Sequence, residues 1–170
     1  LGAPELDAPG PFHSLPNKHL FVKRNSEHHW NISQLFEVDN VNHVNHVNHV
    51  NHVNLAHLRQ ALGLIIEENE GLRHCLIRDA RGIHETITPY AGENVLDLVD
   101  LSAVPAELQS AEIERLAGGF QQSLSLTERL YKFVYFHLGC DQPGRFLYIF
   151  HHVIFDGYSV TIFMSELHDK

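Results

Sequence analysis

Two apolar runs near the C-terminal end, residues 130–138 and 145–150, constrain the fold of this chain most strongly. Both have the length of a strand, and in both the apolar residues follow one another instead of alternating with polar ones. Such short continuous runs, bounded by turn signals, are typical of strands buried on both faces. The segment between them, 139–144, is rich in turn-forming residues. We therefore expect two buried strands here.

The preceding residues supply further strands and helices in mixed order. Apolar residues alternate with polar ones over much of 31–38, which predicts a strand with one more apolar face. Apolar residues at three- and four-residue spacing predict a helix after Asn54, a suitable N-cap, that ends near Gly71. This order predicts an α/β sandwich, a mixed sheet flanked by helices that contains antiparallel pairs. The remaining expected elements are a short helix over 19–24, a hairpin of strands at 72–78 and 83–88, a helix from about 105 to 124 capped by Ser102 or a neighbour, and a helix over 158–167.

The N-terminal segment, residues 1–16, differs in composition from the rest. Four prolines and two glycines interrupt any regular element there, as expected of a linker or tail. The remaining residues, 17–170, are enough for one compact unit with a sizeable core. We expect this part to be a single lobe.

A short repeat occupies residues 41–54, where Val-Asn-His occurs four times. A period of three matches neither a strand nor a helix, so the valines cannot stay on one face of either element. We interpret the segment as a low-complexity, solvated insertion. A sharper alternative is a metal-binding tract, because neutral imidazoles are common metal ligands. We expect no physiological metal site there. The four histidines are His43, His46, His49 and His52.

Composition and charge exclude several classes of function. Twelve basic against 21 acidic residues give a formal net charge of −9, without a stripe of lysines and arginines to neutralise phosphates. This argues against a nucleic-acid partner. No apolar run approaches the roughly 20 residues that a membrane span requires, so we expect a cytoplasmic protein with no membrane contact. Two cysteines, Cys75 and Cys140, are expected to be free thiols, with Cys75 packed in the core.

The segment 151–157, His-His-Val-Ile-Phe-Asp-Gly, contains the residues best suited to chemistry. It follows a buried strand and precedes a helix, a junction where side chains can face a cleft. A histidine such as His152 can act as a general base, because the ordinary pKa of the imidazole is about 6.5. Asp156 can organise the loop, and Gly157 allows a backbone conformation or a close approach that a side chain would prevent. A core role for the two histidines, or a metal pair of histidine and aspartate, remains an alternative.

The same segment resembles the His-His-x-x-x-Asp-Gly signature of condensation domains from nonribosomal peptide synthetases. These domains belong to the superfamily typified by chloramphenicol acetyltransferase. The resemblance covers most of the chain, apart from the repeat and the first dozen or so residues. The supporting segments are 28–33 (His-His-Trp-Asn-Ile-Ser), 58–62 (Leu-Arg-Gln-Ala-Leu), 70–73 (Glu-Gly-Leu-Arg), 100–102 (Asp-Leu-Ser) and 141–145 (Asp-Gln-Pro-Gly-Arg).

The resemblance implies the N-terminal lobe of a two-lobed, chloramphenicol acetyltransferase-like domain. Two carrier proteins would insert phosphopantetheine arms into a tunnel between the lobes, one with an acyl or peptidyl thioester and one with an aminoacyl thioester. His152 would then be the catalytic residue that deprotonates or positions the acceptor amine. Asp156 would be structural and pair with Arg73, while His151 and Gly157 would support the loop. The domain itself would bind no cofactor and no metal, and its partners would be carrier proteins, the other lobe and neighbouring synthetase domains.

Two departures from the family pattern affect these expectations. The first motif of the family usually carries a glutamine followed by an aromatic residue, whereas the matching stretch here, 15–21, reads Leu-Pro-Asn-Lys-His-Leu-Phe. The chain also stops at Lys170, where a full domain would continue into its second lobe. We therefore expect residues 1–170 alone to be inactive.

Two other functions fit parts of the same pattern. An epimerisation domain shares the fold and the motif, and the segment 28–31 is similar to the opening of such domains. Those domains typically follow Asp-Gly with a hydrophobic residue and then Ser-Trp, whereas this chain has Tyr158-Ser159-Val160. That difference favours condensation. The other alternative is a non-catalytic lobe that only binds carrier proteins or a neighbouring domain.

Overall fold

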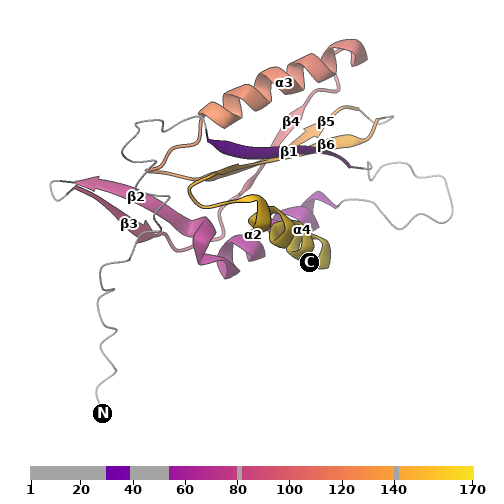
Figure 1. Ribbon diagram of the computed structural model, residues 1–170. Coiled ribbons are helices and arrows are strands. Elements are labelled where there is room, and N and C mark those ends of the chain that lie inside the picture. The colour runs from indigo at the N-terminus through magenta and orange to yellow at the C-terminus, as the bar shows by residue number, and fades with distance from the viewer. Residues whose placement is uncertain (1–29, 39–53, 80–81, 140–141) are drawn as a thin grey trace.

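The computed structural model describes residues 30–38, 54–79, 82–139 and 142–170. The expected short helix at 19–24, the linker at 1–16 and all of the repeat except Asn54 lie outside these ranges. In chain order the elements are β1 (Asn31–Val38), α2 (Leu55–Glu68), the 3-10 helix η1 (Glu70–Arg73), β2 (His74–Asp79), β3 (Gly82–Ile87), β4 (Leu96–Asp100), α3 (Ala106–Gln122), β5 (Tyr131–His137), β6 (Gly144–His151) and α4 (Gly157–Asp169) (Figure 1).

A four-stranded mixed sheet with the order β1-β6-β5-β4 forms the middle layer of the molecule. Strand β6 pairs antiparallel with both β1 and β5, and β4 pairs parallel with β5. A parallel pair needs a long connection, and α3 provides it between β4 and β5. The two central strands, β5 and β6, are almost entirely buried. The two buried strands expected from the apolar runs are therefore confirmed.

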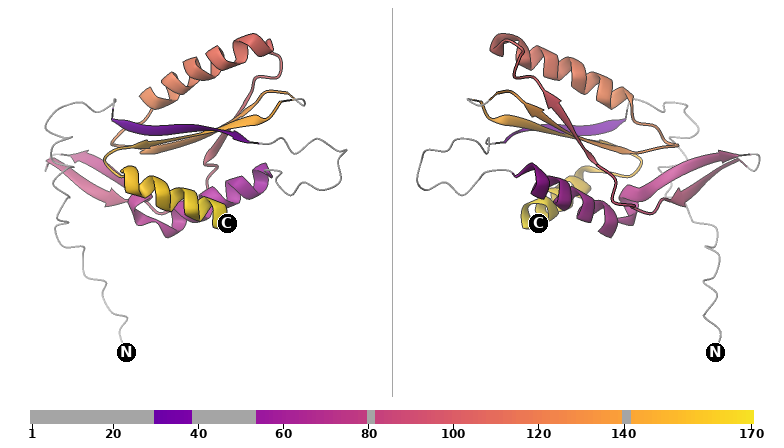
Figure 2. Two further views of the ribbon diagram at one scale, coloured as in Figure 1. Left: turned by 45° about the vertical axis from the view of Figure 1, so that its right-hand side comes forward. Right: turned by 180° about the vertical axis from the view of Figure 1, so that it is seen from behind.

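Helices cover both faces of the sheet, as Figures 1 and 2 show. Helix α3 lies on one face, and α2 and α4 lie against each other on the opposite face. Helix α2 begins where the sequence predicts, because the side-chain oxygen of Asn54 accepts hydrogen bonds from the backbone N–H groups of Ala56 (2.9 Å) and His57 (3.4 Å). The predicted α/β sandwich with a mixed, flanked sheet is confirmed. No helix within the described ranges is both long and apolar enough to cross a bilayer.

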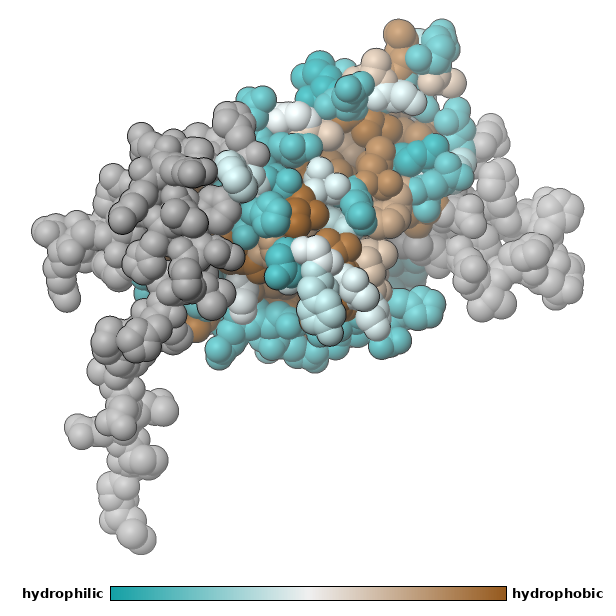
Figure 3. Space-filling model, in the orientation of Figure 1, coloured by the Kyte–Doolittle hydropathy of each residue, from teal (hydrophilic) through white to brown (hydrophobic). Residues whose placement is uncertain are grey.

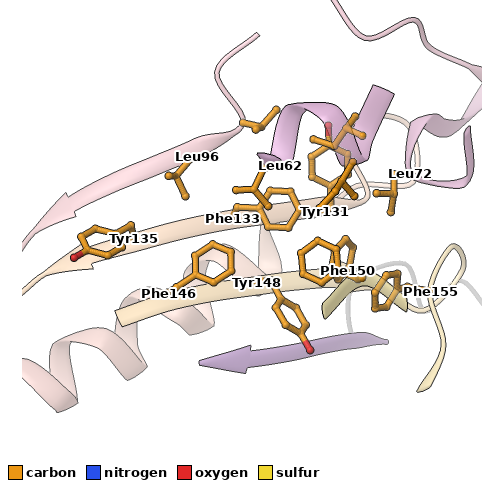
Figure 4. Packing of buried hydrophobic residues seen from close by; sticks show 14 residues of the cluster. Leu62, Leu72, Leu96, Tyr131, Phe133, Tyr135, Phe146, Tyr148, Phe150 and Phe155 are labelled. Carbon is orange, nitrogen blue, oxygen red and sulfur yellow. The ribbon is translucent and has the colours of Figure 1, made fainter. Parts of the chain in front are cut away.

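The alternation of side chains along β5 and β6 divides the core between the two faces of the sheet. Phe133, Tyr148 and Phe150 are fully buried on the face covered by α2 and α4 (Figure 4). Phe163 of α4 stacks on Phe133 with a ring distance of 5.7 Å. Burying each such aromatic ring contributes roughly 1.5–3 kcal/mol. This packing fixes β6 and α4, the two elements that the His-His-x-x-x-Asp-Gly segment connects.

Strands β2 and β3 form a separate antiparallel ribbon, which confirms the expected hairpin. The backbone N–H of Leu76 donates to the carbonyl oxygen of Leu126 at 2.7 Å and so attaches the ribbon to the rest of the lobe. Cys75 is only half-buried, and its sulfur lies 3.5 Å from the hydroxyl of Thr88. The expected core position of Cys75 is therefore wrong, because this ribbon is too thin to bury it. Cys140 lies outside the described residues.

The segment before α3 differs from the sequence expectation. Strand β4 was not predicted, since its residues lie at the sheet edge and mix apolar with acidic side chains. Ser102 does not cap α3; its backbone N–H donates instead to the carboxylate of Asp100 at 2.9 Å. Pro105 is the residue before the helix, without a side-chain capping bond. The serine thus belongs to a turn that ends β4 and lies too early in the chain to reach the helix.

Candidate functional site at the end of strand β6

The His-His-x-x-x-Asp-Gly segment links the last residue of β6 to the first residue of α4. Residues 152–154 form a turn, and the backbone N–H of Ile154 donates to the carbonyl oxygen of His151 at 3.1 Å. At the far end of the segment, the backbone N–H of Val160 donates to the carbonyl oxygen of Asp156 at 3.2 Å. The segment is therefore a tight strand-to-helix connection, as the sequence predicts.

The two adjacent histidines lie in different environments, because neighbouring strand residues point to opposite faces of a sheet. His151 pairs with Asn31 and is completely buried. The side chain of Asn31 donates to the carbonyl oxygen of Gln121 in α3, which identifies this face as the α3 side. His152, one residue further, is exposed. Of the two, the solvent-accessible imidazole is therefore that of His152.

The His151 ring stabilises the turn that carries its neighbour. Its Nδ1 accepts a hydrogen bond from the backbone N–H of Val153 at 3.1 Å. An accepting Nδ1 carries no proton, so this imidazole is neutral with its proton on Nε2. The backbone N–H of His151 also donates to the carbonyl oxygen of Leu130, 2.8 Å away. His151 therefore has the surroundings of a supporting residue.

His152 is held by its backbone while its side chain stays accessible. Its backbone N–H donates to the carbonyl oxygen of Trp30 at 2.7 Å. The rings of the two residues meet edge to face, with centroids 6.4 Å apart and planes at 69°. An exposed imidazole on a fixed backbone can accept a proton or a hydrogen bond from a bound reactant.

Asp156 is the N-cap of α4. Its Oδ1 accepts hydrogen bonds from the backbone N–H and from the hydroxyl of Ser159, both at 2.8 Å. These two bonds, the backbone one first, lower the pKa of the Asp156 carboxyl below its ordinary value, and the nearby His152 adds a smaller lowering effect. Asp156 is therefore ionised at neutral pH and fixes the start of α4.

The structure does not show the contacts that the sequence led us to expect for two other supporting residues, Arg73 and Gly157. Within the described residues, no ion pair joins Arg73 to Asp156, whose carboxylate oxygen is directed at the start of its own helix. Arg73 is the last residue of η1, and its carbonyl oxygen accepts from the backbone N–H of Thr88. Gly157 has an ordinary negative φ, and nothing described lies within 4 Å of the position that a Cβ would occupy. Neither a special conformation nor a close approach within this lobe requires that glycine.

A cleft of about 190 Å³ lies beside the segment, between α4 and the end of α2. Its walls are mostly apolar, and Ile154, Phe155 and Ser159 contribute to it from the segment and the start of α4. At its rim the side-chain amide of Asn69 donates to the carboxylate of Glu166 at 2.9 Å. The sequence does not reveal this cleft, because it depends on how α2 and α4 pack. The remaining lining residues are Ile65, Gly71, Leu72, Ile162 and Phe163.

Sequence reasoning also missed two residues next to the predicted site. Ser159 could have been found, since an N-cap aspartate accepts a hydrogen bond from the backbone N–H of the third helical residue, which is Ser159 here. The position of Trp30 beside His152 depends on the pairing of β1 with β6, for which the sequence carries no local signal. Where described residues are visible in the orientation of Figure 1, the surface is mixed, with hydrophobic patches between polar residues (Figure 3). Trp30 is one of the exposed large hydrophobic residues of the described chain.

Comparison with known proteins identifies relatives of the chain. Residues 21–170 match the family model described as condensation domain. The chain is 34% identical over 144 residues to a linear gramicidin synthase from Brevibacillus parabrevis, covering 84% of this chain and 2% of that protein. It is also 34% identical over 114 residues to a chondramide synthase from Chondromyces crocatus, covering 66% of this chain and 3% of that protein.

Solved structures show the same fold. The first condensation domain of the calcium-dependent antibiotic synthetase superposes with a TM-score of 0.70 at 22% identity, over 93% of this chain and 36% of that one. The starter condensation domain of rhizomide synthetase gives a TM-score of 0.66 at 20% identity, over 89% of this chain and 35% of that one. The chain thus spans about a third of these structures and a few per cent of the synthetases that it matches.

Proposed function

This chain belongs to the condensation-domain family, and from that premise we propose that it supplies the catalytic histidine for amide bond formation in nonribosomal peptide synthesis. The single observation that supports this proposal best is the contrast between the two motif histidines. His151 is buried and stabilises the turn, whereas His152 is exposed at the end of a rigid strand. The family signature implies the same two roles, a supporting first histidine and a catalytic second histidine.

In the proposed reaction, an acceptor amine attacks the carbonyl carbon of a donor thioester. A carbon–nitrogen bond forms, the carbon–sulfur bond breaks, and the proton lost by the amine reaches the leaving thiolate. His152 serves this transfer with an unprotonated ring nitrogen, which accepts the proton or holds the amine by a hydrogen bond. Accepting the proton and holding the amine both require that the His152 imidazole be neutral before the reaction and close to the amine.

The other motif residues keep His152 in place. His151 fixes the turn through the backbone N–H of Val153, and Asp156 fixes the start of α4 through Ser159. His152 lies between these two anchors. We assign supporting roles to His151 and Asp156 on these contacts, and keep Arg73 and Gly157 as supporting residues on the family resemblance alone.

We propose that both substrates reach His152 on carrier proteins, as phosphopantetheine thioesters, and that this domain binds no cofactor of its own. The other partners in this proposal are the rest of the condensation domain and neighbouring synthetase domains, in the cytoplasm. Since the chain spans only about a third of the solved condensation domains, we expect residues 1–170 alone to form no peptide. Peptide formation by that segment alone, from loaded carriers, would contradict this expectation.

One experiment separates condensation from epimerisation. The protein that contains this chain is incubated in deuterium oxide with loaded donor and acceptor carriers, and both peptide product and deuterium at the α-carbon of the bound residue are measured by mass spectrometry. Condensation gives product without added deuterium. Deuterium at the α-carbon without product would establish epimerisation, and carrier binding with neither signal would establish a non-catalytic lobe.

A further inference from the structure

Trp30 is the residue that lies beside His152 across the sheet. Strand β1 begins at Asn31, which pairs with His151, so Trp30 and His152 form the next pair beyond the ladder. The hydrogen bond from the His152 backbone to the Trp30 carbonyl confirms that pairing. Paired residues of antiparallel strands place their side chains on the same face, and the edge-to-face contact of the two rings follows from it.

The two contacts between these residues have different chemical requirements. Any residue at position 30 can supply the backbone carbonyl, whereas only a large aromatic side chain can supply the ring contact. The Trp30 side chain is also costly to expose, yet 45% of its surface remains accessible. Its centroid distance of 6.4 Å from the His152 ring lies within the range of attractive aromatic pairs. The indole is therefore placed to act on the imidazole itself.

We infer that Trp30 is a positioning residue for His152: its indole limits the rotation of the exposed imidazole and holds the ring in the orientation that meets the acceptor amine. The hydrogen bond described for His152 is made by its backbone N–H, so the backbone stays fixed without the indole. The ring contact described for the His152 imidazole is the one with the Trp30 indole. This inference rests on the proposed function, since orientation matters to the rate only if His152 acts on the amine.

The first test is kinetic and uses the complete condensation protein with loaded carriers. Trp30→Ala removes the ring contact and keeps the carbonyl, and we expect kcat to fall about two- to tenfold with little change in KM. Trp30→Phe restores most of the rate. Leu35→Ala is the matched control, because Leu35 lies on β1, the strand that follows Trp30, is 46% exposed, and belongs to the opposite face of the sheet. A rise in KM with unchanged kcat would overturn the inference and make Trp30 a substrate contact.

The second test needs no turnover. Diethyl pyrocarbonate reacts with accessible, unprotonated imidazoles, and the modification of His152 can be followed over a pH series by peptide mass spectrometry. Among the described residues, Asp156 is a charged group close enough to interact with His152, and it is unchanged in the variant. We expect Trp30→Ala to raise the modification rate of His152 about two- to tenfold, with Leu35→Ala unchanged. Equal rates in the native protein and Trp30→Ala would refute the ring contact, whatever reaction the domain catalyses.

Discussion

The backbone N–H of His152 donates to the carbonyl oxygen of Trp30 at 2.7 Å, so the backbone pairing of β1 and β6 continues one residue beyond their last regular pair, Asn31 and His151. The preceding backbone N–H, that of His151, donates to the carbonyl oxygen of Leu130 on the other side, at 2.8 Å. Two successive amides are thus held by two different parts of the chain. The exposed imidazole therefore projects from a backbone that is fixed on both sides.

The cap at Asp156 should contribute measurably to stability. Asp156→Ala removes the acceptor for Ser159, and we expect the melting temperature to fall by a few degrees. Asp156→Asn should keep most of the stability at neutral pH, because asparagine is an equally good N-cap. Circular dichroism melts of the three proteins check this. Equal losses for the two variants would show that the charge, and not the cap, is what matters.

The Asp156 carboxylate should make the melting temperature depend on pH in the acidic range. Its pKa is lowered in the folded protein, so its contribution is present above the unfolded pKa of about 4 and is lost as the pH falls through the lower folded value. Melting temperatures between about pH 2 and pH 6 should therefore converge for the native protein and Asp156→Ala at the acidic end. A constant difference across that range would contradict the assigned pKa direction.

Gly144 should not tolerate a side chain. A Cβ at this position would lie 2.1 Å from the hydroxyl oxygen of Tyr135, and the buried tyrosine ring cannot easily move away. We expect Gly144→Ala to cost about 1–3 kcal/mol, as overpacked cores do. Gly71→Ala is the control, since nothing lies within 4 Å of its Cβ position. Urea unfolding measures both, and Tyr135→Leu in the Gly144→Ala background should recover part of the loss.

The buried phenol of Tyr131 should limit stability in alkali. Burial raises its pKa to about 12, so the folded state keeps the proton longer than the unfolded state, where tyrosine titrates near about 10. Its contribution is complete below about pH 10 and is lost as the pH rises towards 12. Tyr131→Phe should flatten the decline in unfolding free energy across that window. An unchanged slope would show that another group causes the alkaline loss.

Most of the fold could be predicted because the strongest patterns are local. The continuous apolar runs of β5 and β6, the helical spacing after Asn54 and the alternation of 31–38 each specify an element without knowledge of its neighbours. Strand β4 escaped prediction because an edge strand that pairs on one side needs no apolar run. Its pairing with β5 is decided by tertiary contacts.

The site likewise contains residues that a local motif identifies and residues that only tertiary contacts bring together. His151, His152, Asp156 and Gly157 are adjacent in the sequence, so a motif identifies them together. The place of Trp30 depends on the register of two strands more than a hundred residues apart, and the cleft depends on the packing of α2 against α4. Among the described residues Arg73 and Asp156 form no ion pair, because the Asp156 carboxylate accepts from Ser159 at the start of its own helix.

The most direct test of the central claim is the rate of peptide formation by the complete condensation protein, with loaded donor and acceptor carriers, in native form and as His152→Ala. His57→Ala serves as the control, because His57 is an exposed histidine on α2 outside the motif. We predict that His152→Ala lowers the rate about a hundredfold or more while carrier binding and the control rate stay unchanged. Product formation by His152→Ala at the native rate would contradict the account.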